Sequence, residues 1–259
     1  MKEIRVVCCQ FRPVSGEVAS NRRKIGDLAA GSKRLAPHVL VFPEVCVQGI
    51  SPSEIIVKTA ESIPGETSKL VCALSKEYNV YCVVGIAERS VGKLFNAAML
   101  TGPDGKLLGV YRKTHLWTTE REIYSSGTEY PVFETDFGKV GIWICYDTRF
   151  PEVARKLSLQ GATMAMVPTA WLSRDVEHWK LAVRSRALDN FMYVCGADEI
   201  LESDFHQSCG ASLICDPNGR LLAEASPKKE MAISAKLDPA LPSQLRASIP
   251  VLEDMQIKV

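Results

Sequence analysis

Apolar and polar positions follow two different periods along the chain, and together they predict alternating strands and helices. Short runs that are apolar at nearly every position are typical of strands buried on both faces. Charged residues interleaved with apolar residues at helical spacing predict helices that bury one face. The strand-like runs are residues 4–9, 38–42, 80–87, 164–168, 192–197 and 232–236, and the helix-like runs are residues 19–35, 68–78, 152–160 and 176–190.

Three turn signals add hairpins to this pattern. Residues 102–105 (Gly-Pro-Asp-Gly), 137–138 (Phe-Gly) and 216–219 (Asp-Pro-Asn-Gly) each separate two short strand-like runs, as hairpin turns do. Hairpins mixed with strand–helix units indicate mixed rather than purely parallel sheets. We therefore predict an α/β fold, a four-layer αββα sandwich with two mixed β-sheets. It forms a single domain over residues 1–259, with residues 240–259 as an exposed C-terminal arm.

Composition fits a globular protein and narrows its partners. Hydrophobic residues make up 46% of the 259 residues, and 31 Lys and Arg against 30 Asp and Glu leave a net charge of +1. Such a chain has no overall attraction to nucleic acid or to an anionic membrane. Its apolar runs are shorter than the ~20 residues that span a bilayer, and its start does not resemble a signal peptide. We expect no nucleic-acid partner, no membrane association and a cytoplasmic location.

The nine cysteines favour reduced thiols over disulfides or metal ligands. An odd number cannot pair completely within one chain, and most lie in apolar strand-like runs, where free cysteine packs as a small hydrophobic residue. The sequence contains neither Cys-x-x-Cys nor His-Glu-x-x-His, and its four histidines are scattered. We therefore expect no metal and no cofactor.

Three polar residues stand out because each lies at or just after the end of a strand-like run. They are Glu44, Lys113 and Cys145, and ligands of α/β folds bind beyond the carboxyl ends of strands. A carboxylate there can be a general base, a lysine can stabilise an oxyanion, and a cysteine at a strand-to-helix corner can be a nucleophile. Taken singly, each also has a simpler explanation, as a solvated surface charge or as one more buried cysteine.

Together, in this order, the three segments resemble the Glu–Lys–Cys triad of the carbon–nitrogen hydrolase (nitrilase) superfamily. Residues 42–44 with Gly49 match the glutamate motif, residues 111–117 the lysine motif and residues 145–152 the cysteine motif. One departure is Ile50, where many members have an aromatic residue. The resemblance continues through residues 167–171, 186–190 and 210–219, so that it covers nearly the whole chain.

The resemblance implies a hydrolase whose Cys145 forms a thioester with an amide substrate. Glu44 would take the thiol proton, protonate the leaving ammonia and then activate water. Lys113 and the backbone N–H of Tyr146 would stabilise the oxyanion. No cofactor enters such a reaction.

A second glutamate and a set of pocket walls are also implied. The family spacing assigns the second glutamate to Glu120 and not to Glu122, because only Glu120 stands four residues before an aromatic residue and seven before a glycine. It would orient the substrate or Lys113. Candidate pocket walls are Tyr111, Trp117, Thr169, Ala170 and Trp171, although each aromatic residue is equally compatible with an ordinary core or interface position.

The residues around the nucleophile favour amides as substrates. Tyr146-Asp147 stands where true nitrilases usually have Trp-Glu, and Thr148 stands where D-carbamoylases place an additional arginine. Arg174 could bind a substrate carboxylate instead. We predict hydrolysis of a small aliphatic or ω-amide to a carboxylic acid and ammonia. The alternatives are an N-carbamoyl amino acid or amine hydrolase and, from another class, a non-catalytic protein that kept the fold. The resemblance also implies a homodimer or higher homo-oligomer.

Overall fold

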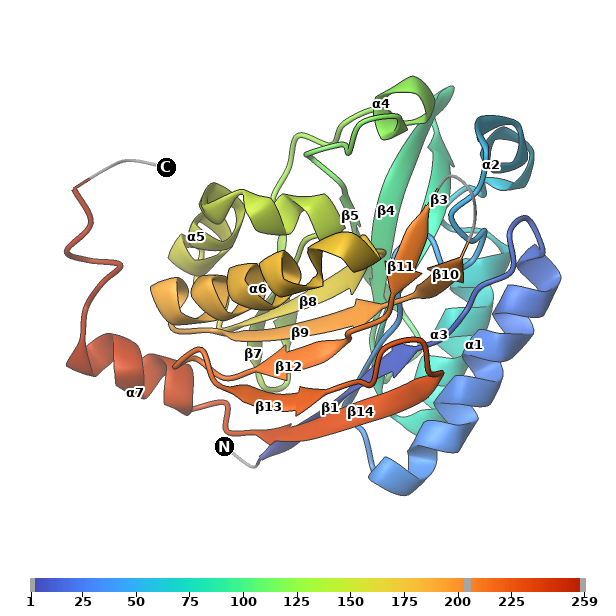
Figure 1. Cartoon of the computed structure of the whole chain (residues 1–259). Coiled ribbons are helices and arrows are strands. Elements are labelled where there is room, and N and C mark those ends of the chain that lie inside the picture. Colours follow the sequence, from blue (N-terminus) through green and yellow to red (C-terminus); the bar gives the residue numbers. More distant parts are fainter. Residues whose placement is uncertain (1–2, 203–205, 257–259) are drawn as a thin grey trace.

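The computed structural model describes residues 3–202 and 206–256, without the side chain of Cys209. Two six-stranded sheets lie face to face, and helices cover the outer face of each sheet (Figure 1). The prediction of a four-layer α/β sandwich with two mixed sheets is confirmed.

The first sheet combines the N-terminal strands with the last strand of the chain. Its order is β14-β1-β2-β3-β4-β5, in which β1, β2 and β3 run parallel and the other pairs are antiparallel. Helices α1 (Val18–Ser32) and α3 (Glu66–Tyr78) pack on its outer face. The strands are β1 (Ile4–Gln10), β2 (Val39–Val41), β3 (Tyr81–Ser90), β4 (Lys93–Thr101), β5 (Leu107–Arg112) and β14 (Met231–Leu237).

The second sheet has the same mixed character and uses the middle of the chain. Its order is β13-β12-β9-β8-β7-β6, with β7, β8 and β9 parallel. Helices α5 (Pro151–Leu159) and α6 (Val176–Asn190) cover its outer face. The strands are β6 (Val132–Thr135), β7 (Gly138–Ile142), β8 (Met164–Thr169), β9 (Tyr193–Asp198), β12 (Leu213–Cys215) and β13 (Leu221–Glu224).

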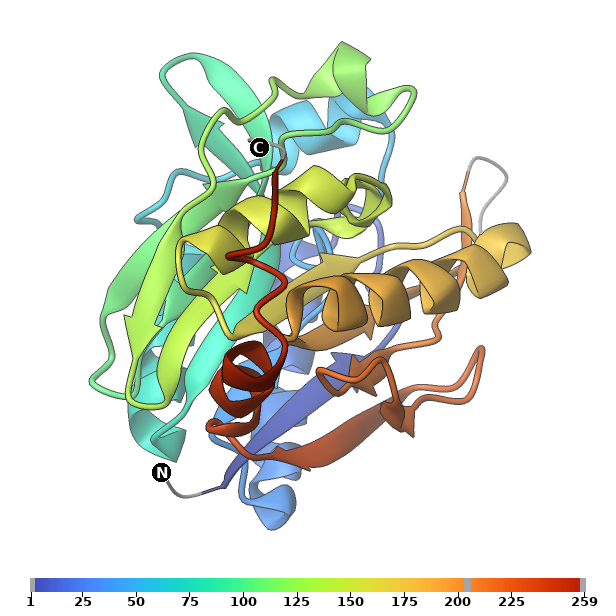
Figure 2. The same ribbon diagram turned by 90° about the vertical axis from the view of Figure 1, so that its left-hand side faces the viewer.

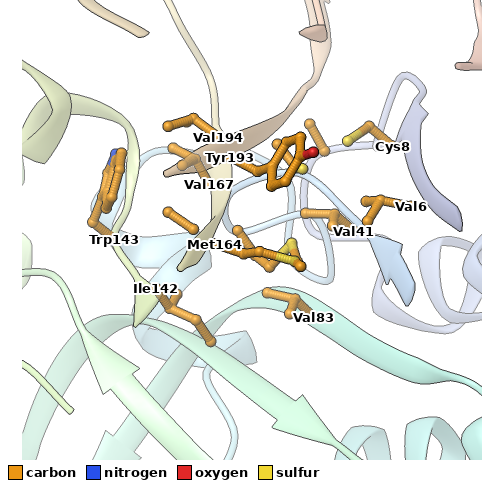
Figure 3. Close-up of a cluster of buried hydrophobic side chains, with 14 of the residues drawn as sticks. Val6, Cys8, Val41, Val83, Ile142, Trp143, Met164, Val167, Tyr193 and Val194 are labelled. Carbon is orange, nitrogen blue, oxygen red and sulfur yellow. The ribbon is translucent and has the colours of Figure 1, made fainter. Parts of the chain in front are cut away.

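The main core lies between the two sheets. Alternate residues of one strand point to opposite faces, so Val6 and Cys8 of β1 face the second sheet, whereas Val7 and Cys9 face the helices. Figure 3 shows this interior, to which Val83 from the first sheet and Ile142 from the second both contribute. Burial of each such side chain stabilises the fold by about 1.5–3 kcal/mol. The two sheets are therefore held firmly together.

Several short elements were not predicted. They are α2 (Ser53–Thr59), α4 (Glu120–Ile123), β10 (Ile200–Glu202) and β11 (Gln207–Cys209). Each spans two helical turns or less, or three strand residues, which is too short for hydrophobic periodicity to identify. Helix α4 nevertheless carries Glu120, and β10 follows a pair of buried acids, so these short elements lie close to the functional part of the molecule.

Part of the C-terminal segment that we expected to be an exposed arm is helical. Leu241–Ser248 forms helix α7, which lies at the end of the molecule where α5 and α6 end (Figures 1 and 2). Arg246 anchors it, because its guanidinium donates to Asn190 O at 2.9 Å and to Ala162 O at 2.8 Å. Residues 257–259 of the expected arm lie outside the described residues.

Cysteines and helices were also assessed over the described part of the chain. The eight cysteines whose side chains are described are all free thiols, and seven of them are buried. None of the helices in residues 3–202 and 206–256 is both long enough and apolar enough to cross a membrane.

Candidate active site

A cavity of about 470 Å³ opens beyond the strand ends of both sheets. Except for Tyr111 and Thr169, the predicted site residues line it: Glu44, Lys113, Trp117, Glu120, Cys145, Tyr146, Ala170 and Trp171. Apolar side chains such as Ile50 and Ile123 complete one wall, and Arg149, Arg174 and Asp175 also border the space. A largely apolar cavity with a few convergent polar groups is the usual form of a small-molecule site.

Cys145 lies at a sharp corner directly after β7. Its φ of 44° is in the left-handed region, a conformation that costs a non-glycine residue about 1–3 kcal/mol and is common at functional sites. The turn Cys145–Arg149 that follows is a 3-10 helix, and α5 begins at Pro151. Cys145 as a whole residue is 9% exposed. The corner thus presents one sulfur atom to the cavity from an otherwise buried position.

A charged cluster faces this corner. The ammonium of Lys113 donates to Glu44 Oε1 at 2.6 Å and lies 2.8 Å from Glu120 Oε2. Asn96 Nδ2 donates to Glu44 Oε1 at 2.7 Å and to Glu120 Oε1 at 2.8 Å. The backbone N–H of Trp117 completes the shell of Glu120 at 2.6 Å. Lys113 and Glu44 are only 1% and 2% exposed, so water contributes little to holding these charges.

Burial and charge determine where the protons reside. Burial alone would lower the pKa of Lys113, but the charges of Glu120 and Glu44 outweigh it and raise the pKa well above the ordinary value. Burial raises the pKa of the Cys145 thiol well above its usual value, Glu44 adds to the effect, and Lys113 opposes it. The resting site therefore holds a lysine ammonium and a neutral thiol. Burial also raises the pKa of Glu120, although Lys113 acts in the opposite direction.

Close backbone packing positions the two motifs of the first sheet. A side chain at Gly85 of β3 would place its Cβ 2.2 Å from Pro43 O, so only glycine lets the turn before Glu44 approach the sheet. A Cβ at Gly127 would likewise meet Arg112 O at 2.2 Å, while the Gly127 N–H donates to Lys113 O at 2.8 Å. The loop that carries Glu120 is thereby returned to the end of β5.

Thr169 and Tyr111 occupy positions behind the cavity wall. Thr169 ends β8 and is fully buried, and its hydroxyl together with the Ala170 backbone partly offsets the raised pKa of the Cys145 thiol. The expectation that Tyr111 lines the pocket is wrong, because this side chain is fully buried and its hydroxyl donates to Asp147 Oδ2 at 2.7 Å. Its aromatic ring belongs to the core between the sheets.

Sequence reasoning missed three buried polar residues near the site. Asn96 lies in β4 and joins both carboxylates of the cluster, and its polar character within an apolar strand was a usable signal. Asp198 and Glu199 stand at the end of β9 and are fully buried. The rule that singled out Glu44, an acid directly after an apolar strand, would have found them too.

The mouth of the cavity carries two arginines and one acid. The guanidinium of Arg149 lies 4.9 Å from the centre of the Trp171 ring and 3.5 Å from Asp175 Oδ2. Arg174, with a largely exposed side chain, approaches the same oxygen at 3.9 Å. One carboxylate facing two guanidinium groups leaves this rim with a net positive charge.

Comparison with known proteins identifies relatives over the whole length of the chain. The carbon–nitrogen hydrolase family model matches residues 5–247. An omega-amidase of Xenopus tropicalis, NIT2, is 34% identical over 97% of this chain and 94% of its own length. A probable nitrilase of Schizosaccharomyces pombe is 32% identical over 90% of this chain and 88% of its own length.

Solved structures share the fold. Nit3 of Saccharomyces cerevisiae, a member of branch 10 of the nitrilase superfamily, superposes with a TM-score of 0.88 at 28% identity and covers 99% of this chain and 97% of its own. An amidase of Nesterenkonia, solved as a double mutant in complex with acrylamide, has a TM-score of 0.87 at 20% identity over 98% of this chain and 94% of its own, a similarity that extends to the fold alone.

Proposed function

The chain belongs to the carbon–nitrogen hydrolase family, and we propose that it hydrolyses the carbon–nitrogen bond of a small amide to a carboxylic acid and ammonia. The observation that carries this proposal is Lys113, whose ammonium binds Glu44 and Glu120 in the wall of the cavity that Cys145 also lines. A nucleophile, a base and a cation are thus available to one bound molecule. A non-catalytic protein that kept the fold would not require this arrangement.

In the first half of the reaction, Cys145 is acylated. Because the resting thiol is neutral, Glu44 takes its proton as the sulfur attacks the amide carbonyl carbon. The negative charge that develops on the carbonyl oxygen is stabilised by the Lys113 ammonium and the backbone N–H of Tyr146. The carbon–nitrogen bond then breaks, and Glu44 returns its proton to the departing nitrogen, which leaves as ammonia.

In the second half, water cleaves the thioester. Glu44 takes a proton from a water molecule as the water oxygen attacks the thioester carbonyl carbon, and Lys113 again stabilises the oxyanion. The carbon–sulfur bond breaks, the sulfur regains the proton from Glu44, and the carboxylic acid leaves. Glu120 and Asn96 do not exchange protons in this scheme. Glu120 holds the Lys113 ammonium at 2.8 Å, and Asn96 holds the two carboxylates of Glu44 and Glu120 at 2.7 and 2.8 Å.

The rim of the cavity favours an ω-amide of a short carboxylic acid over a neutral amide. Arg149 and Arg174 share the single carboxylate of Asp175, so a substrate carboxylate at the mouth would be attracted electrostatically. Several relatives bear the name omega-amidase. An N-carbamoyl substrate remains the alternative, and Tyr146-Asp147 after the cysteine disfavours nitriles.

A substrate panel tests the proposal. Ammonia release is measured with a short aliphatic amide, the monoamide of a short dicarboxylic acid, an N-carbamoyl amino acid and a nitrile. We expect the monoamide to be the best substrate and Cys145→Ala to be inactive, whereas Cys72→Ala, at a cysteine away from the cavity, keeps full activity. Absence of ammonia release from every amide would contradict the proposal, and preference for the N-carbamoyl compound would favour the alternative.

The quaternary structure and the location stay predictions. We propose a homodimer or higher homo-oligomer, for which light scattering at several protein concentrations is the direct test. A monomer at all concentrations would contradict it. The cytoplasmic location is likewise a proposal.

A further inference from the structure

We propose that Asp147 is a positioning residue that joins the lysine loop of the first sheet to the cysteine corner of the second, and so sets the place of Lys113 relative to Cys145. The inference rests on the proposed function, because it concerns the same site. Asp147 is fully buried and does not line the cavity, so it acts through its neighbours and not on the substrate.

Five hydrogen bonds converge on the Asp147 carboxylate. Oδ1 accepts from the Thr114 hydroxyl at 3.0 Å, from the His115 backbone N–H at 2.9 Å and from His115 Nδ1 at 2.8 Å. Oδ2 accepts from the Tyr111 hydroxyl at 2.7 Å and from the Ile144 backbone N–H at 3.0 Å. A carboxylate offers about four lone-pair sites, so these donors use its full capacity.

The donors to Asp147 come from segments of both sheets. Tyr111 lies in β5 of the first sheet, and Thr114 and His115 directly follow Lys113. Ile144 and Asp147 flank Cys145 at the end of the second sheet. The two halves of the proposed active site therefore come from different sheets, and one buried carboxylate connects the residues next to each reactive group.

An aromatic row follows the same junction. The His115 ring stacks on Phe150 at 3.7 Å, Phe150 meets Tyr146 edge-on at 5.2 Å, and Tyr146 meets Trp117 at 4.8 Å. Tyr146 and Trp117 line the cavity. The His115–Phe150 and Trp117–Tyr146 pairs each join a ring that follows Lys113 to a ring that follows Cys145, and the Tyr146–Phe150 contact links these two pairs. A shift of either segment therefore also moves the cavity wall.

No neutral side chain of the same shape can replace the Asp147 carboxylate as an acceptor of all these bonds. Burial raises the pKa of Tyr111 well above its usual value, and Asp147 adds to this effect, so the tyrosine remains a hydroxyl donor. In Asp147→Asn one acceptor oxygen becomes an NH₂ donor and faces at least one of the five donors without a lone pair. The side chain keeps its size while the junction loses its attraction.

The experiment compares Asp147→Asn with a matched control, Glu61→Gln. The Glu61 carboxylate also accepts several bonds, from Arg22 at 2.7 Å and from the Thr67 hydroxyl and N–H at 2.7 and 3.1 Å, but it does not line the cavity. With the best amide of the panel, we expect Asp147→Asn to lower kcat by about 10²-fold, the effect of a misplacement of roughly 1 Å, with KM changed less than threefold. Glu61→Gln should keep kcat while its Tm falls.

A second measurement needs no substrate. The rate at which iodoacetamide alkylates Cys145, measured against pH, reports how readily this thiol ionises. The groups that face the thiol are Glu44, Lys113, Thr169 and the Ala170 backbone. Since the Lys113 charge favours the thiolate, Asp147→Asn should alkylate several-fold more slowly at pH 8 than the wild type. If the wild type releases no ammonia but this difference is found, the positioning role stands and the proposed function fails.

Two single-donor variants cover the case in which Asp147→Asn does not fold. Tyr111→Phe and Thr114→Val each remove one hydroxyl donor and leave the carboxylate in place. We expect each to reduce kcat about three- to tenfold and to slow the alkylation of Cys145. The proposal is overturned if folded variants at these three positions keep kcat and the alkylation profile of the wild type and lose only Tm, as Glu61→Gln is expected to do.

Discussion

Two groups of buried carboxyls lie side by side and differ in their partners, above all in the presence of a lysine. Thr169 O accepts from the backbone N–H of Glu44 at 3.4 Å and from that of Glu199 at 3.2 Å, so both acids start from the same carbonyl. Glu44 has Lys113 and Asn96 on its carboxylate. Glu199 has no hydrogen-bond partner on either oxygen among the described residues.

The group without a lysine keeps its protons. Burial raises the pKa of Glu199 well above its usual value, and the charges of Glu44 and Asp198 add to the shift. Burial also raises the pKa of Asp198, although the N–H of Trp171 partly opposes it. An unpaired buried acid keeps its proton and cannot accept another. Burial alone therefore does not make an acid able to take a proton, and the contact with Lys113 is what distinguishes Glu44, the proposed general base, from Glu199.

Removing the lysine should break the comparison most severely. In Lys113→Met, Glu44 and Glu120 face each other without a cation, and the oxyanion loses its charged donor. We expect kcat/KM for the best amide to fall by roughly 10³–10⁴-fold, measured by ammonia release. The exposed Lys139→Met is the control and should stay within twofold. A loss of less than tenfold in Lys113→Met would show that the lysine is not required.

Removing the shared amide should have the next largest effect. In Asn96→Ala, each carboxylate loses one donor at 2.7–2.8 Å, while Lys113 remains. We expect kcat to fall by about 10- to 100-fold, since a hydrogen bond to a charged group is worth about 1.5–3 kcal/mol. Steady-state kinetics check this. Unchanged kcat would mean that Lys113 alone holds the two carboxylates.

The rim offers the inverse arrangement, one carboxylate shared by two cations. In Arg174→Ala, Asp175 keeps Arg149, but the positive excess at the mouth is lost. For the monoamide of a dicarboxylic acid we expect KM to rise about tenfold, and for a neutral amide of the same length we expect no change. Equal effects on both substrates would contradict a carboxylate contact.

The smallest effect on activity is expected for Glu199→Gln, which should also stabilise the folded protein at high pH. As pH rises through about 4.3, the usual pKa of glutamate, the unfolded chain releases the Glu199 proton while the folded protein keeps it. Folding stability therefore falls with rising pH up to the raised folded pKa. Glu199→Gln cannot ionise and should therefore be more stable than the wild type at pH 8.

Urea unfolding at pH 8 and pH 4.5 measures this difference, which should shrink at the lower pH. Activity should stay within about threefold of the wild type. If Glu199→Gln is less stable than the wild type at pH 8, or loses activity more than tenfold, Glu199 is charged or catalytic and the comparison with Glu44 fails.

Residues with local signals were predictable from the sequence, and residues with distant partners were not. The long strands and hairpins followed from apolar runs and turns, and Glu44, Lys113 and Cys145 from their strand-end positions and motif order. A lysine after a strand is usually solvated, so the burial of Lys113 required a resemblance to suggest it. Asp147 was visible in the cysteine motif, but its partners Tyr111, Thr114 and His115 lie more than 30 residues earlier, and no spacing rule connects them.

The most direct test of the central claim is the mass of the Cys145 peptide during turnover. The enzyme is mixed with the best amide, quenched in acid within the first turnovers and digested, and each cysteine peptide is weighed. A carbon–nitrogen hydrolase that uses Cys145 as its nucleophile should show this peptide heavier by the acyl group of the amide, and the adduct should disappear after the substrate is exhausted. An acyl adduct on another cysteine, or turnover with no adduct on any cysteine and full activity of Cys145→Ala, would contradict the claim.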